Sequence, residues 1–144
     1  MDSGRLAWEI ADRAGHAHAL FGGLLEIVVT PMGLSRGEAV AMAVLLEFPA
    51  GLSQSEWARL QGVSRQHAHA LSRKLGRAGL VVGRRRGREV NVRLSAAGHR
   101  RVVAARPALE ATLARGIAGL SVREVKDLHR LLGKLVRSLE EARP

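Results

Sequence analysis

The first fifth of the chain carries apolar residues at helical spacing and predicts one long amphipathic helix over residues 4 to 29. Its apolar positions are Leu6, Ile10, Ala14, Ala17, Phe21, Leu24 and Val28. Thr30-Pro31 is expected to end this helix, because a residue that precedes proline resists helical geometry.

Serine-x-x-glutamate sequences mark three further helix starts. They are Ser35 to Glu38, Ser53 to Glu56 and Ser121 to Glu124, and each matches a capping box. The predicted helices span about residues 35–48, 53–61, 64–78, 95–115 and 121–142, with a kink at Pro107 in the fifth. In the last helix, apolar residues alternate at spacings of three and four, which is typical of a coiled-coil seam. They are Val125, Leu128, Leu132, Leu135 and Leu139.

Between residues 80 and 94 the apolar period changes to two, which predicts two short strands at 80–82 and 90–94. The sequence GRRRGRE joins them, with Gly83 and Gly87 expected to supply the turn geometry. Before this hairpin, Gly62-Val63 separates two short helices, which is the helix-turn-helix plan. The pattern therefore predicts a mainly helical chain with a helix-turn-helix and a two-stranded hairpin.

Charge is concentrated in the same region. Residues 57 to 106 hold twelve Arg and one Lys against the single acid Glu89, a balance of +12, whereas the rest of the chain balances at −2. Such a basic region indicates a polyanionic partner. The chain has no cysteine, which excludes disulfides and thiolate metal sites. Apolar stretches are interrupted by Glu26 and Glu47, and the N-terminus lacks a secretion signal, so we expect a cytoplasmic, nucleoid-associated protein without a membrane segment.

The second helix of a helix-turn-helix enters the major groove, where its first residues meet base edges. Gln66 can pair with adenine, and Arg65 with guanine or a phosphate. A solvated polar face is the alternative for an isolated helix, but the adjoining arginine-rich hairpin favours DNA. The predicted DNA-binding residues are Ser53, Gln54, Ser64, Arg65, Gln66, His67, His69, Arg73, Arg84, Arg85, Arg86 and Arg88.

The stretch QSEWARLQGVSRQHAHALSRKLGRAGLVVGRRRGREVNVRLSAAG resembles the multiple-antibiotic-resistance regulator (MarR) family of winged-helix repressors. Gly-Val-Ser-Arg-Gln and Gly-Leu-Val are its most specific pieces, and the resemblance covers most of the chain. It implies a single domain over 1–144, with a winged helix-turn-helix at about 35–95 and dimerisation helices at about 4–29 and 96–142. The apolar stripe of the first helix and the seam of the last supply the predicted dimerisation residues, Leu6, Ile10, Val125, Leu128, Leu132, Leu135 and Leu139.

The resemblance further implies a homodimer that represses transcription from a pseudo-palindromic operator on double-stranded DNA and is released by a small aromatic or phenolic effector. The chain departs from the family at the wing, where the usual Asp-x-Arg reads Arg86-Gly87-Arg88. It also has Ala70 where an arginine is common, and His67 where Thr or Val is common.

Trp8, Asp12 and His16 share one face of the first helix and are the candidate effector-pocket residues, although Trp8 can instead pack on a partner subunit. Neither His-x-His pair can chelate an ion from one helical face, so no metal or other cofactor is expected. Trp57 is expected in the core. No nucleophile motif or phosphate-binding loop indicates an enzyme. A sequence-tolerant architectural protein that coats nucleic acid remains the alternative function.

Overall fold

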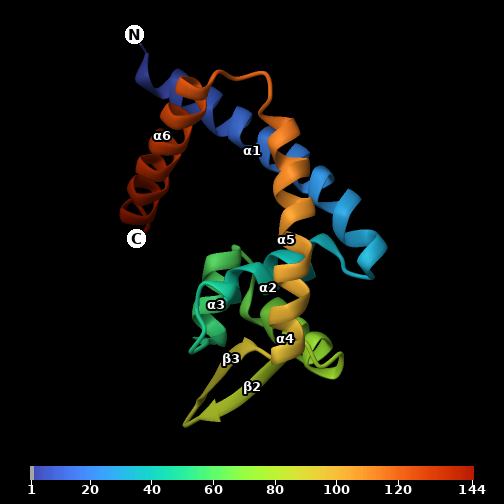
Figure 1. The fold of residues 1–144 in the computed structure, drawn as a ribbon. Helices are drawn as coiled ribbons and strands as arrows, with labels where there is room; N and C mark the ends of the chain where they lie inside the picture. Colours follow the sequence, from blue (N-terminus) through green and yellow to red (C-terminus); the bar gives the residue numbers. More distant parts are fainter. Residues whose placement is uncertain (1) are drawn as a thin grey trace.

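The computed structural model describes residues 2–144 and is built mainly of helices, with one small sheet (Figure 1). In chain order the elements are α1 (Ser3–Val29), the 3-10 helix η1 (Thr30–Met32), α2 (Arg36–Leu46), β1 (Leu52–Ser53), α3 (Gln54–Gln61), α4 (Arg65–Arg77), β2 (Val81–Arg86), β3 (Glu89–Leu94), α5 (Ala96–Gly116) and α6 (Val122–Glu141). All six predicted helices are confirmed, and α5 continues through Pro107.

Of the three predicted capping boxes, the structure completes only the one at the start of α6. There the Glu124 carboxylate accepts from the Ser121 amide at 2.7 Å, and the serine hydroxyl accepts in return from the Glu124 amide. At α2 and α3 the serine hydroxyl caps the helix as predicted. The predicted return contact, in which the glutamate carboxylate accepts from the serine amide, is wrong. The Glu38 carboxylate turns to Lys74, and the Glu56 carboxylate pairs with an arginine one turn later. A nearby cation is a stronger partner for a carboxylate than a backbone amide.

The sheet has three antiparallel strands in the order β1-β3-β2. The predicted hairpin is confirmed, but β2 runs on through the arginine triplet to Arg86. The expectation that Gly83 forms part of the turn is wrong, because Gly83 lies inside β2 opposite Val92. Gly87, with a φ of 63°, is the glycine that adopts the left-handed conformation in the two-residue turn. Strand β1 was not predicted; its two residues extend the sheet through Leu52 opposite Val92.

The buried core lies in the region from α2 to β3. Its members are Ala41, Met42, Leu45, Leu52, Trp57, Ala58, Ala68, Leu71, Leu75, Leu80, Val81 and Val92. Trp57 is fully buried, as expected, and its indole Nε1 donates a hydrogen bond to the Ala41 carbonyl oxygen at 2.9 Å. This bond satisfies the one polar atom of the side chain, so the indole can fill the centre of the core without a desolvation penalty.

The long helices α1, α5 and α6 are much less buried than this core. Helix α6 contains no buried residue, and its apolar residues Leu128, Leu132 and Leu139 remain 42%, 46% and 58% exposed. Figure 1 shows that α1 and the C-terminal half of α5 lie at the end of the molecule opposite the β2–β3 hairpin. No single helix in residues 2–144 is long and apolar enough to cross a membrane; α1 with η1 and α2 passes such a test only as a pair bent by 93°.

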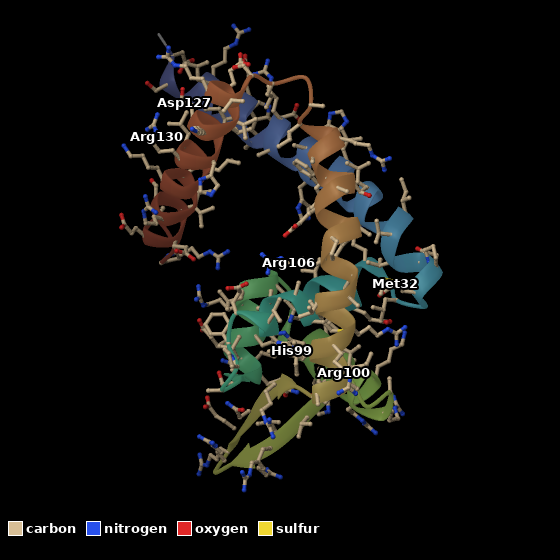
Figure 2. The ribbon with its side chains drawn as sticks, viewed as in Figure 1. Met32, His99, Arg100, Arg106, Asp127 and Arg130 are labelled. Carbon is tan, nitrogen blue, oxygen red and sulfur yellow. The ribbon has the colours of Figure 1, made fainter. Side chains whose placement is uncertain are left out.

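Polar side-chain contacts join α5 and α6 to elements earlier in the chain. The Arg101 guanidinium on α5 donates to the backbone carbonyl of Met32, which Figure 2 shows beside α5. On α6, Glu140 lies 3.8 Å from Arg59 of α3, with both side chains about half exposed. The first contact fixes the junction between α1 and α2 against α5, and the second is a weak surface ion pair.

Candidate nucleic-acid interface

Helix α4 presents one apolar face to the core and a polar face to solvent. Ser64 caps it, its hydroxyl accepting from the His67 amide at 3.0 Å, and Ala68, Leu71 and Leu75 are buried. Gln66 and Arg73 lie on the opposite side of the helix, and both are exposed. The polar residues of α4 therefore form a continuous outward surface, which the structure leaves free to meet a ligand.

Arg77 belongs to the same outward surface, because it follows Arg73 by four residues and Gln66 by eleven. It was missing from the predicted DNA-binding residues. Its helical spacing from Gln66 and Arg73 is the sequence signal that identifies it. His69 lies beside this stripe and is also exposed.

His67 occupies a different part of α4 from Gln66. It lines a cavity of about 270 Å³ with Glu38 and Lys74, and a second of about 200 Å³ with side chains of α1 and α2. The structure thus places His67 on the flank of α4 that faces the rest of the molecule, one residue away from the outward stripe. Its predicted contact with base edges remains a prediction.

The register of the hairpin separates its arginines onto two faces. Residues directly opposite in an antiparallel pair share a face, so Arg85, opposite Val90, lies on the same face as the buried Val92. Arg84 and Arg86 point to the other face, and so does Arg93, which lies opposite Val82. All are exposed. The arginines that were predicted to crowd one turn therefore lie along both faces of the β2–β3 hairpin. Arg88 lies in the turn at its tip.

None of these arginines forms an ion pair within residues 2–144, and the single acid of the hairpin, Glu89, lies opposite Arg86. The salt bridges of the structure involve none of the hairpin arginines, nor Arg65, Arg73 or Arg77. Figure 2 shows Arg100 on the part of α5 nearest the hairpin, which adds to the same positive region. Like charges crowded on an exposed surface destabilise the protein unless an anion neutralises them, so the arrangement favours a polyanionic ligand.

The start of α3 contributes a smaller part of the surface. Ser53 caps α3, its hydroxyl accepting from the Glu56 amide at 3.1 Å, and Gln54 is half-buried beside it. Ser53 and Arg65 line one open hollow of about 550 Å³, which also reaches Glu89 of the hairpin. The structure therefore brings two predicted residues, Ser53 at the start of α3 and Arg65 at the start of α4, around one hollow beside the hairpin.

The candidate effector residues Trp8, Asp12 and His16 lie on exposed surface of α1 and line neither of the two cavities that His67 lines. Trp8 is 76% exposed. The cavity of about 200 Å³ is lined instead by the next turns of α1, by α2 and by the α3–α4 connection. The pocket assignment of these three residues remains a prediction, and so does the packing of Trp8 on a partner.

That cavity contains a guanidinium close to the backbone of α1. Arg36 passes against Gly22, where any Cβ atom would overlap its side chain. Its charge is only loosely balanced, because the Glu26 carboxylate is 3.8 Å away and about half exposed. Phe21 and His18 complete the α1 side of the cavity. An arginine beside an aromatic ring and apolar walls suits a small anion that carries an apolar body.

The chain matches no protein-family model and no curated protein sequence. Solved structures, in contrast, are similar over nearly its whole length. A MarR-family transcriptional regulator from Rhodococcus sp. RHA1 has a TM-score of 0.82 at 20% identity, covering 90% of this chain and 94% of that one. CouR from Rhodococcus jostii RHA1, bound to p-coumaroyl-CoA, has a TM-score of 0.77 at 20% identity, covering 88% and 90%.

The Mycobacterium tuberculosis MarR-family protein Rv2887 is similar in two states. Its complex with salicylic acid has a TM-score of 0.68 at 28% identity, covering 94% of this chain and 96% of that chain. Its complex with DNA has a TM-score of 0.67 at 27% identity, covering 94% and 98%. With the capped α3–α4 pair and the basic hairpin, these similarities show that the chain has the winged helix-turn-helix fold of MarR-family regulators.

Proposed function

We propose that this protein is a homodimeric, sequence-specific DNA-binding regulator that represses transcription from a pseudo-palindromic operator. The observation that carries the proposal is the outward stripe of α4, formed by Gln66, Arg73 and Arg77, beside a hairpin whose arginines form no ion pair within residues 2–144. A helix with hydrogen-bonding side chains fits the major groove. The basic hairpin next to it fits the phosphates that border the adjacent minor groove.

The two parts are expected to contribute different kinds of binding energy. Gln66 pairs with a base edge, so Gln66→Ala should lose about 1–3 kcal/mol on the cognate duplex and little on other DNA. Arg88, at the wing tip, lies at or near the minor groove. Arg88→Ala should weaken binding to every duplex, with an additional loss on A·T-rich flanks. It should also lower the salt slope, which is the slope of log affinity against log salt concentration, by about one.

The test begins with a randomised duplex library from which the wild-type protein enriches its preferred sequence. Affinities of both variants are then measured on that duplex and on a scrambled duplex of the same composition, at two salt concentrations. Arg13→Ala on α1, an exposed arginine remote from α4, is the matched control. An equal loss from Gln66→Ala on both duplexes would show that α4 does not read the sequence.

A sequence-tolerant coating protein is the second candidate, favoured by the unpaired arginines on both faces of the hairpin. It would bind the enriched and scrambled duplexes with similar affinity and leave no discrete footprint. A dimeric regulator should instead enrich two inverted half-sites about one helical turn apart, because a two-fold axis relates its two α4 helices. Library selection and footprinting therefore separate the two functions.

The cavity beside Arg36 supports the proposal that a small aromatic carboxylate regulates DNA binding. Its volume of about 200 Å³ suits a single ring, and His67 links its wall to α4. Rv2887 has been solved with salicylic acid, so salicylate is the probe of choice. Salicylate should raise the melting temperature of the wild type and release it from DNA, whereas Arg36→Gln should abolish both effects. Arg13→Gln is the control, and equal responses of both variants would exclude this cavity.

A further inference from the structure

The second helix, α2, holds a carboxylate that the proposed DNA contacts do not use. Glu38 is 6% exposed, and its Oε1 lies 2.6 Å from the Lys74 Nζ on α4. Its backbone amide donates to the Ser35 hydroxyl at 3.1 Å, which fixes the glutamate in the first turn of α2. A carboxylate is favoured there by the partial positive charge of a helix N-terminus. The backbone of Glu38 is therefore fixed in the first turn of α2, and its carboxylate is free to bind a residue of another element.

Lys74 is the only residue through which an ion pair or side-chain hydrogen bond joins α4 to another element, among the residues that the structure describes. The side chains that α4 buries against its neighbours are apolar, namely Ala68, Leu71 and Leu75, and the Leu80 amide donates a backbone hydrogen bond to the Leu75 carbonyl at its C-terminal end. Apolar packing is non-directional and permits a helix small rotations about its axis. A short ion pair on the flank of the helix restricts such rotation, because it requires one distance and one direction.

We infer that Glu38 is a positioning residue for sequence recognition, which through Lys74 fixes the rotation of α4 and so the place where Gln66 and Arg73 meet the base edges. The inference rests on the proposed function, because it assigns a role in reading DNA. Hydrogen bonds to bases depend on geometry more steeply than attraction to phosphates does. A small rotation of α4 therefore weakens binding to the preferred sequence and leaves general DNA binding intact.

A different role for Lys74 makes opposite predictions. If Lys74 contacted a phosphate, Glu38 would merely compete for its charge, and Glu38→Gln would strengthen binding to every duplex. Lys74→Met would then weaken binding to every duplex and lower the salt slope by about one. If Lys74 acts through Glu38, both variants lose about ten-fold in affinity for the preferred duplex and keep their affinity for other duplexes. The salt slope then changes little.

The experiment measures Glu38→Gln, Lys74→Met and the double variant on the duplex enriched by the wild type and on its scrambled form. The double variant should lose no more than either single variant, because both remove the same contact. Lys74→Arg should retain most of the selectivity, since it keeps the charge and the donors. Glu110→Gln breaks a 2.7 Å ion pair on α5 that does not involve α4, and its selectivity should equal that of the wild type.

The outcomes are distinguishable from failure of the proposed function. If the wild type itself does not discriminate between the two duplexes, the proposed function fails. If the wild type discriminates and both single variants keep its full selectivity, the positioning role of Glu38 is refuted. Melting curves establish that each variant is folded at the assay temperature. Should Glu38→Gln unfold, Lys74→Met decides the matter, because Lys74 is 67% exposed and is not among the residues of the apolar core.

Discussion

The exposed leucines of α6 provide the most direct test of the proposed homodimer. Leu128, Leu132 and Leu139 lie on one side of the helix and are about half exposed in the single chain. A helix with an apolar side and no buried residue does not stabilise itself in water. We therefore expect a second copy of the chain to cover these residues.

The expected effect of Leu132→Ala with Leu139→Ala follows from their exposure. Complete burial of a leucine contributes about 1.5–3 kcal/mol, and roughly half of this contribution is still unrealised in the single chain. Each leucine should therefore contribute about 1 kcal/mol to the dimer. Two leucines in two subunits sum to about 4 kcal/mol, which raises the dissociation constant of the dimer about a thousand-fold. Alanine preserves the helix, because it has the highest helix propensity.

Sedimentation over a concentration series measures the dissociation constant of the wild type and the double variant. Lys126→Ala, on the opposite face of α6, is the matched control and should leave the constant unchanged. The variant should also lose affinity for the palindromic duplex while keeping the weaker affinity of a single half-site. A wild type that sediments as a folded monomer at micromolar concentration, or a variant that dimerises as tightly as the wild type, would refute the reasoning.

Three further predictions concern stability. Gly98→Ala should lower the free energy of unfolding by about 1–3 kcal/mol in urea titrations, because a Cβ atom would overlap the Leu80 carbonyl oxygen in the backbone. Trp57→Phe should cost about 1–3 kcal/mol, measured in the same way, because it removes the buried indole hydrogen bond and leaves a void. The hydrogen bond from Lys74, together with the positive charge of Lys74, lowers the pKa of Glu38 below the ordinary value of 4.5. This stabilisation is complete above about pH 4.5 and is lost as the pH falls through the lowered pKa, so the difference in melting temperature between wild type and Glu38→Gln should shrink on acidification.

The sequence by itself determined the elements whose signals are local. Ser35, Ser53, Ser64, Ser95 and Ser121 each cap the helix that was expected to follow, because a cap involves only a hydroxyl and an amide three residues away. The change of apolar period located the hairpin for the same reason. Concentration of charge in residues 57–106, with the motifs of α3 and α4, was sufficient to indicate a winged helix-turn-helix that binds a polyanion.

Tertiary structure alone decided which partner each side chain takes. Glu38 matched a capping box in sequence, yet it pairs with a lysine 36 positions later, because folding brings the Lys74 ammonium within 2.6 Å of the carboxylate. His67 and Gln66 are neighbours in the chain, but one helical step places them on a cavity wall and on the outward face respectively. Strand register similarly divided the arginines between two faces of the hairpin. Register, burial and long-range ion pairs depend on residues far apart in the chain, and no local pattern encodes them.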